Sequence, residues 1–133
     1  VHGDLKDTNI FVEQHPDPQR LHRAKLLDFG LSRLLTKHSS MVGGSLHWLA
    51  PEVFQVRKRR LAPEPAADIF ALGHLAFFTA TSLVPGEELA RQELQRLLEK
   101  GQLPDLRWTP HDGLALCLRP LVEQCRLPMP VRV

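Results

Sequence analysis

The segment from Asp68 to Ala80 is the feature that most limits the folds open to this chain. Its large apolar side chains would lie on every side of an α-helix and not along one stripe: Ile69, Phe70, Leu72, Leu75, Phe77 and Phe78. A helix that is apolar all round is stable only where other protein surrounds it. The sequence therefore predicts a buried central helix with the other elements packed around it.

Two more helices are expected after this segment. The first opens at Pro85-Gly86-Glu87-Glu88, pairs Glu87 with Arg91 and ends at Gly101, and its buried stripe comprises Ala90, Leu94, Leu97 and Leu98. The second takes Thr109 as its N-cap and Asp112 as its N3 acid, and Pro120 should kink or split it. Its expected buried stripe comprises Leu114, Leu118, Leu121, Val122 and Cys125.

The N-terminal part is predicted to contain a short β-hairpin. Residues 10–12 and 24–27 are apolar or β-prone, and a charged connection joins them. Residues 30–44 are rich in hydroxyls and glycines, which favours an extended, adjustable loop. The fold class is therefore mainly α, a helical bundle around a buried central helix with a short β-hairpin near the N-terminus.

Composition excludes several classes of function. The 133 residues carry a net charge of +2, which is too balanced to predict a nucleic-acid or membrane surface. No apolar run reaches the roughly 18 residues of a membrane span. Cys117 and Cys125 lie in a helical pattern and are expected to be buried, reduced thiols, which favours a cytoplasmic location.

Two short motifs carry chemistry. The first is His2-Gly3-Asp4-Leu5-Lys6-Asp7-Thr8-Asn9, and the second is Leu27-Asp28-Phe29-Gly30. Asp4 could accept a proton from a hydroxyl, Lys6 could meet phosphate, and the oxygens of Asn9 and Asp28 are ligands that Mg²⁺ prefers. Each residue alone is also a common turn former, but the complete ordered set is hard to obtain by chance.

These motifs, with two later ones, resemble the C-terminal lobe of a eukaryotic protein kinase. Residues 2–9 are similar to the catalytic loop, and residues 28–30 to the metal-binding motif. Residues 45–52 are similar to the end of the activation segment, and residues 68–73 to the start of the central helix of the family. The sequence of residues 48–52 is most similar to that of the tyrosine-kinase-like group, whose members mostly phosphorylate Ser/Thr.

The resemblance implies ATP and Mg²⁺ as cofactors and a protein substrate phosphorylated on Ser/Thr. Asp4 would be the catalytic base, Lys6 a contact of the γ-phosphate, Asn9 and Asp28 the metal ligands, and Phe11 the residue below the adenine. The remaining implied site residues are Phe29, Gly30, Ser45, Trp48, Pro51 and Glu52 in the activation segment and His2, Asp68 and Gly73 in structural roles. Asp68 would bond the catalytic-loop backbone, and a role as helix N-cap is compatible with that. Glu52 would pair with Arg132.

Three departures from the protein kinase pattern leave other functions open. Gly3 replaces the arginine that in the family receives a phosphate on the activation loop, where Thr36, Ser39 and Ser40 are possible sites. His-Gly-Asp also resembles small-molecule phosphotransferases, although residues 48–52 and 68–73 argue against that alternative. Because a nucleotide clamp is missing, residues 1–133 are expected to be a partial kinase domain without the N-terminal lobe and inactive alone. A pseudokinase or a protein-interaction module stays open as an alternative.

Overall fold

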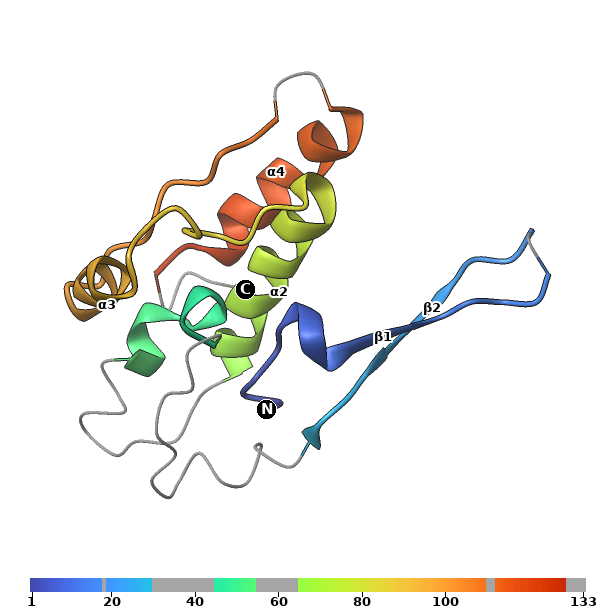
Figure 1. The fold of residues 1–133 in the computed structure, drawn as a ribbon, viewed down its shortest axis with the longest axis horizontal. Coiled ribbons are helices and arrows are strands. Elements are labelled where there is room, and N and C mark those ends of the chain that lie inside the picture. The colour runs from blue at the N-terminus through green and yellow to red at the C-terminus, as the bar shows by residue number, and fades with distance from the viewer. Residues whose placement is uncertain (18, 30–44, 55–64, 110–111, 129–133) are drawn as a thin grey trace.

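The computed structural model describes residues 1–17, 19–29, 45–54, 65–109 and 112–128 (Figure 1). The elements, in chain order, are η1 (Asp7–Asn9), β1 (Ile10–Glu13), β2 (Arg23–Leu26), η4 (Ser45–Trp48), α2 (Pro65–Thr81), α3 (Arg91–Glu99) and α4 (Gly113–Cys125). The predicted mainly α fold with one hairpin is confirmed. The loop of residues 30–44 with its possible phosphosites, and Arg132 as the partner of Glu52, lie outside the described residues.

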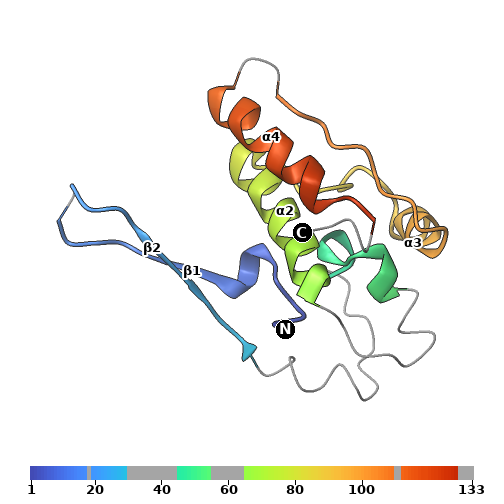
Figure 2. The same ribbon diagram turned by 180° about the vertical axis from the view of Figure 1, so that it is seen from behind.

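Helix α2 is the centre of the molecule, and α4 packs along it in both views (Figures 1 and 2). Phe70 and Phe77 are 0% and 1% exposed, as expected for a central helix. Phe70 joins a core with η4, the residues that follow it, and α3: Leu46, Leu49, Ala50, Val53, Phe54, Leu94 and Leu98. Leu72 is 49% exposed, so within the described part of the chain α2 is not enclosed on every side.

The close approach of α2 and α4 depends on Gly73. A Cβ atom at this position would lie 2.4 Å from the Cβ of Cys125 on α4. Real Cβ atoms do not approach so closely, so any other residue would force the two helices apart. Gly73 is therefore needed for helix packing.

Helix α3 is shorter than predicted. It begins at Arg91, whereas residues 85–89 form turns in which the Glu87 carboxylate accepts a hydrogen bond from the Val84 amide. Glu87 and Arg91 are thus not an i,i+4 pair within a helix. The expected end at Gly101 is confirmed, because this residue has a φ of 71° and its amide bonds Leu98. Of the predicted stripe, Leu94 and Leu98 are buried, Leu97 is half-buried and Ala90 is exposed.

Helix α4 differs from its prediction in its cap and in its buried face. The N-cap is Asp112, whose carboxylate accepts hydrogen bonds from the amides of Leu114 and Ala115, so the assignment of Thr109 is wrong. The helix continues through Pro120 without being split. Its buried residues are Ala115, Val122 and Cys125, whereas Leu114 and Leu121, placed in the buried stripe by the sequence, are each 50% exposed.

The thiols and the C-terminal end of α4 complete this part of the fold. Cys117 and Cys125 are both free, but Cys117 is exposed, so the expectation of two buried thiols is half wrong. Arg126, which follows α4, donates a hydrogen bond to the Pro104 carbonyl. Burial lowers the pKa of its guanidinium to about 10.

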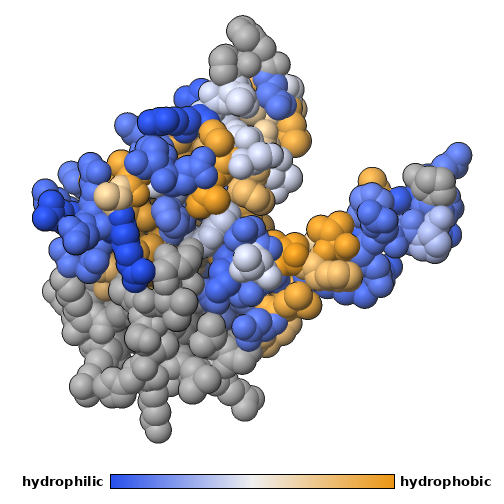
Figure 3. Space-filling view, viewed as in Figure 1, coloured by the Kyte–Doolittle hydropathy of each residue, from blue (hydrophilic) through white to orange (hydrophobic). Residues whose placement is uncertain are grey.

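The β1–β2 hairpin projects from the helical body (Figure 1). Its antiparallel register pairs Ile10 with Leu26 and Glu13 with Arg23. Glu13 also forms an ion pair with Lys25 at 2.9 Å, and this hydrogen-bonded partner lowers the pKa of the Glu13 carboxyl. Figure 3 shows hydrophobic surface along the hairpin, where Val12 is 55% exposed.

None of the helices found in the described ranges has both the length and the apolar character that crossing a membrane requires.

Candidate active site

The N-terminal loop is held against α2 by one carboxylate. The amides of His2 and Gly3 donate to Asp68 Oδ2 and Oδ1 at 2.6 and 2.8 Å. Gly3 has a φ of 78°, a conformation that glycine adopts without strain, and it turns its amide toward Asp68 beside that of His2. Asp68 lies inside α2, which begins at Pro65, so its alternative role as helix N-cap is wrong.

His2 connects this loop to the end of β2. Its Nε2 donates to the Leu27 carbonyl at 3.0 Å, and its Nδ1 accepts from the Asp4 amide at 3.4 Å. Because a carbonyl can only accept and an amide N–H can only donate, the ring is the neutral tautomer with its hydrogen on Nε2. The ring of Phe29 packs edge-on against that of His2, with centroids 5.0 Å apart. His2 therefore contacts both the Asp4 backbone and the Phe29 ring.

Asp4 lies between two partners from its own loop. Lys6 Nζ is 2.7 Å from Asp4 Oδ2, and the Asn9 side-chain nitrogen is 3.2 Å from the same oxygen. The same nitrogen also bonds the Asp4 carbonyl at 2.8 Å. Asn9 is 7% exposed, so this loop conformation is fixed from within. Three of the predicted site residues are therefore brought together around one carboxylate.

Asn9 and Asp28 are brought close by the backbone. The Leu27 amide donates to the Asn9 carbonyl at 2.8 Å, so Asp28 follows directly after a residue bonded to Asn9. Asp28 has a φ of 60°, a left-handed backbone conformation, two residues after the end of β2. The Asn9 amide nitrogen faces Asp4, which leaves the amide oxygen on the other branch of the side chain. An amide oxygen and a carboxylate are a donor set that fits Mg²⁺.

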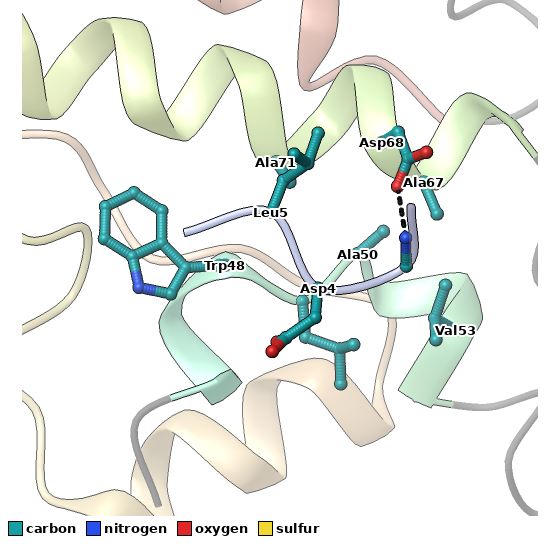
Figure 4. Close-up of a pocket in the computed structure, with 10 residues that line it drawn as sticks. Asp4, Leu5, Trp48, Ala50, Val53, Ala67, Asp68 and Ala71 are labelled. Carbon is teal, nitrogen blue, oxygen red and sulfur yellow. Dashed lines mark hydrogen bonds between the residues drawn. The ribbon is translucent and has the colours of Figure 1, made fainter. Parts of the chain in front are cut away.

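Figure 4 shows a cavity next to Asp4, and the residues that line it are called the Asp4 wall below. Residues of the loop, of η4 and of α2 enclose a cavity of about 20 Å³, whose lining includes Asp4, Leu5, Trp48 and Ala71. In this view the Asp4 carboxylate points away from α2. Trp48 is 5% exposed and packs edge-on against Phe78 of α2 at 5.9 Å. Asp4 and Trp48 of η4 thus line the same cavity.

The other predicted residues of the activation segment lie in or beside this wall. Ser45 is the first residue of η4, and Pro51 and Glu52 begin the helical residues 51–54. Pro51 is buried and Glu52 is half-buried. Gly30 lies outside the described residues.

Phe11 lies on β1 of the hairpin, two residues after Asn9. It is 52% exposed and pairs with Lys25 across the two strands. Because alternate residues of a strand point to opposite faces, Phe11 shares a face with Glu13 and not with Ile10. Its predicted contact with adenine remains a prediction.

Two residues of this region did not enter the sequence-based site. His74 of α2 and His47 of η4 are linked by a hydrogen bond of 2.6 Å from His74 Nδ1 to the His47 carbonyl. A polar residue within the apolar run of residues 68–80 was the available indication for His74. Nothing in the sequence around His47 indicated its partner, because the two residues are 27 positions apart.

Comparison with known proteins now identifies the family. The sequence model of the protein kinase domain matches residues 1–125. The chain belongs to the protein kinase family. It is 32% identical over 127 residues to the serine/threonine-protein kinase dst4 of Dictyostelium discoideum, which covers 89% of this chain and 25% of that protein.

Two further kinases are similar over most of the chain. Serine/threonine-protein kinase SBK1 of Mus musculus is 31% identical over 112 residues, 80% of this chain and 26% of that protein. Mitogen-activated protein kinase kinase kinase 3 of Arabidopsis thaliana is 31% identical over 127 residues, 94% of this chain and 20% of that protein. The chain thus spans about a quarter or less of the length of these kinases.

Proposed function

We propose that this chain supplies the catalytic loop, the metal ligands and part of the substrate-facing wall of a kinase that phosphorylates Ser/Thr hydroxyls of proteins with ATP. One observation carries the proposal. The Asp4 carboxylate is held by Lys6 and Asn9 on a loop whose backbone is fixed by Asp68. A positioned carboxylate with an adjacent ammonium is suited to accept a hydroxyl proton beside a charged phosphoryl group.

In the proposed reaction, the substrate hydroxyl gives its proton to the Asp4 carboxylate. The hydroxyl oxygen forms a bond to the γ-phosphorus of ATP while the bond from that phosphorus to the β-phosphate oxygen breaks, which releases ADP. Lys6 is 2.7 Å from Asp4 Oδ2, so its ammonium is within reach of negative charge on both the carboxylate and the transferred group. The hydrogen bond from Asn9 keeps Asp4 from rotating away from the hydroxyl.

Asn9 and Asp28 would hold Mg²⁺, which would neutralise negative charge on the phosphates during transfer. The donor types and the bond from Leu27 to Asn9 support this assignment. Phe11, on the exposed hairpin face, is proposed as the contact for adenine.

Three further assignments belong to the same proposal: the kinase group, the acceptor residue and the location. The sequence of residues 48–52 supports the tyrosine-kinase-like group, and the similarity to the serine/threonine-protein kinases dst4 and SBK1 supports Ser/Thr and not Tyr as the acceptor. A cytoplasmic location is supported by the two free thiols, which a reducing compartment would preserve.

The test is Asp4→Asn in the full-length protein that contains this sequence. We expect kcat for phosphate transfer to a Ser/Thr peptide to fall about 10²- to 10⁴-fold, because the amide cannot accept the proton. Asp7→Asn is the matched control, the same chemical change in the same loop, and should alter kcat less than threefold. Transfer that survives Asp4→Asn would contradict the assignment of Asp4. A wild-type protein that binds partners but transfers no phosphate would favour the pseudokinase alternative.

A further inference from the structure

His74 is a buried donor in the middle of α2. It is 2% exposed, and its ring lies against the Phe70 ring with centroids 4.2 Å apart. Its Nδ1 is 2.6 Å from the His47 carbonyl oxygen. Since a carbonyl oxygen can only accept, the hydrogen of the His74 ring must be on Nδ1. One imidazole therefore ties α2 to η4.

His47 continues the connection with its own ring. Its Nδ1 is 2.8 Å from the Pro85 carbonyl, which again requires the ring nitrogen to be the donor. Pro85 is buried in the turns that precede α3. Two imidazoles in series thus connect η4 to two later segments, α2 and the turns at residues 85–89.

Helix α2 holds both the loop that carries Asp4 and the segment η4. Asp68 fixes the amides of His2 and Gly3, and His74, six residues later on α2, fixes the backbone of η4. Trp48, directly after His47, lines the cavity that Asp4 also lines (Figure 4). Both anchor points lie on one helix within two turns of each other, so α2 links the loop that carries Asp4 to η4.

We propose that His74 and His47 are positioning residues, which hold η4 at a fixed distance from Asp4 and thereby set how well a protein substrate fits beside the catalytic base. The proposal rests on the proposed kinase function. Neither imidazole touches the reacting atoms. Their effect is on the segment that the substrate must pass to reach Asp4.

The test compares two replacements of His74 in the full-length protein. His74→Leu fills a similar space without a donor, whereas the side-chain amide of His74→Asn carries an N–H near the position of Nδ1. We expect His74→Leu to raise KM for a Ser/Thr peptide about tenfold, which corresponds to about 1.4 kcal/mol, with KM for ATP unchanged. His74→Asn should restore KM for the peptide to within about threefold of wild type. His47→Leu and His47→Asn should show the same contrast.

A role in stability alone would not produce this pattern. In that case His74→Leu would lower the amount of folded, active protein without changing KM for the peptide. Equal increases of KM for peptide and ATP, or a His74→Asn protein as impaired as His74→Leu, would overturn the proposal.

Two measurements that do not depend on catalysis test whether the two imidazoles hold η4 in place. Long-range ¹H–¹⁵N NMR of the wild-type rings should show the hydrogen on Nδ1 of both His74 and His47, and a hydrogen on Nε2 alone would overturn the proposal. Hydrogen exchange of residues 46–50 should become faster in His74→Leu and stay near wild type in His74→Asn. If wild type transferred no phosphate, the proposed function would fail, while these two measurements would still report whether the imidazoles fix η4.

Discussion

At the scale of single residues, the site depends on a carboxylate that makes two backbone hydrogen bonds at once. Asp68 presents one oxygen to the His2 amide and the other to the Gly3 amide. Only a carboxylate has two acceptor oxygens at this spacing, since an amide replaces one of them with a donor. The loop that carries Asp4 is therefore fixed by a chemical feature that Asp has and Asn lacks.

Asp68→Asn should destabilise the protein by about 1–3 kcal/mol, because the new NH₂ group would face a backbone N–H and leave one amide without an acceptor. The free energy of unfolding in urea measures this loss. Asp7→Asn, the same change in the loop itself, should stay within about 0.5 kcal/mol of wild type. An Asp68→Asn protein as stable as the control would show that the two bonds do not hold the loop.

At the scale of elements, the start of α4 shows where reasoning from local patterns goes wrong. Thr109-Pro110-His111-Asp112 has the residue types of a helix start with Thr109 as the cap. In the structure, Asp112 takes that position, because its carboxylate reaches the amides of Leu114 and Ala115 at 2.8 and 3.3 Å. Which face of α4 is buried is decided by its packing against α2, and there Ala115 is buried whereas Leu114 is 50% exposed.

Replacing each of the two candidate caps separates these assignments. Asp112→Ala should cost about 0.5–2 kcal/mol of stability, because two amides of the first turn lose their acceptor. Thr109→Ala is the matched control and should change stability by less than about 0.5 kcal/mol. Thermal unfolding followed by circular dichroism would measure both, and a larger loss for Thr109→Ala would contradict the cap seen in the structure.

What could be predicted from the sequence was set by local interactions. The central helix and the terminating Gly101 depend on residues within a few positions of one another, and the hairpin depends on two strands that follow one another in the sequence. All three were predicted. The Asp4 motif was found for the same reason. The bond from His74 to His47 and the exposed face of α4 depend on contacts between distant segments. Periodicity describes one helix, but it does not say which neighbour packs against it.

At the scale of the whole molecule, α2, which holds the loop that carries Asp4, packs against α4 in the C-terminal part of the fold. Gly73 is the point of closest approach, since a Cβ there would lie 2.4 Å from the Cys125 Cβ. Gly113, at the start of α4, has no atom within 4 Å of the equivalent position. The two glycines therefore provide a matched pair for testing the packing.

Gly73→Ala should destabilise the protein by about 1–3 kcal/mol through overpacking, and Gly113→Ala should be neutral or stabilise it by up to about 1 kcal/mol. Adding Cys125→Gly to Gly73→Ala removes the colliding Cβ and should recover part of the loss, although glycine in a helix itself costs about 1 kcal/mol. Urea unfolding of wild type, the single variants Gly73→Ala, Gly113→Ala and Cys125→Gly, and the double variant gives the five free energies that are needed. Independent, additive effects of the two substitutions would show that the collision is not the cause.

Glycine at position 3 affects whether phosphorylation of the activation loop could control the whole kinase. The family resemblance places an arginine here that binds a phosphate on the activation loop, and glycine has no side chain with which to do so. We expect phosphatase treatment of the full-length protein to change kcat/KM for a Ser/Thr peptide less than threefold, as should joint replacement of Thr36, Ser39 and Ser40 by Ala. Gly3→Arg would not simply restore phosphate binding, because a φ of 78° strains any residue with a Cβ. This substitution should lower stability by about 1–2 kcal/mol. A tenfold loss of activity after phosphatase treatment, with the fold intact, would mean that a cation other than residue 3 binds the phosphate.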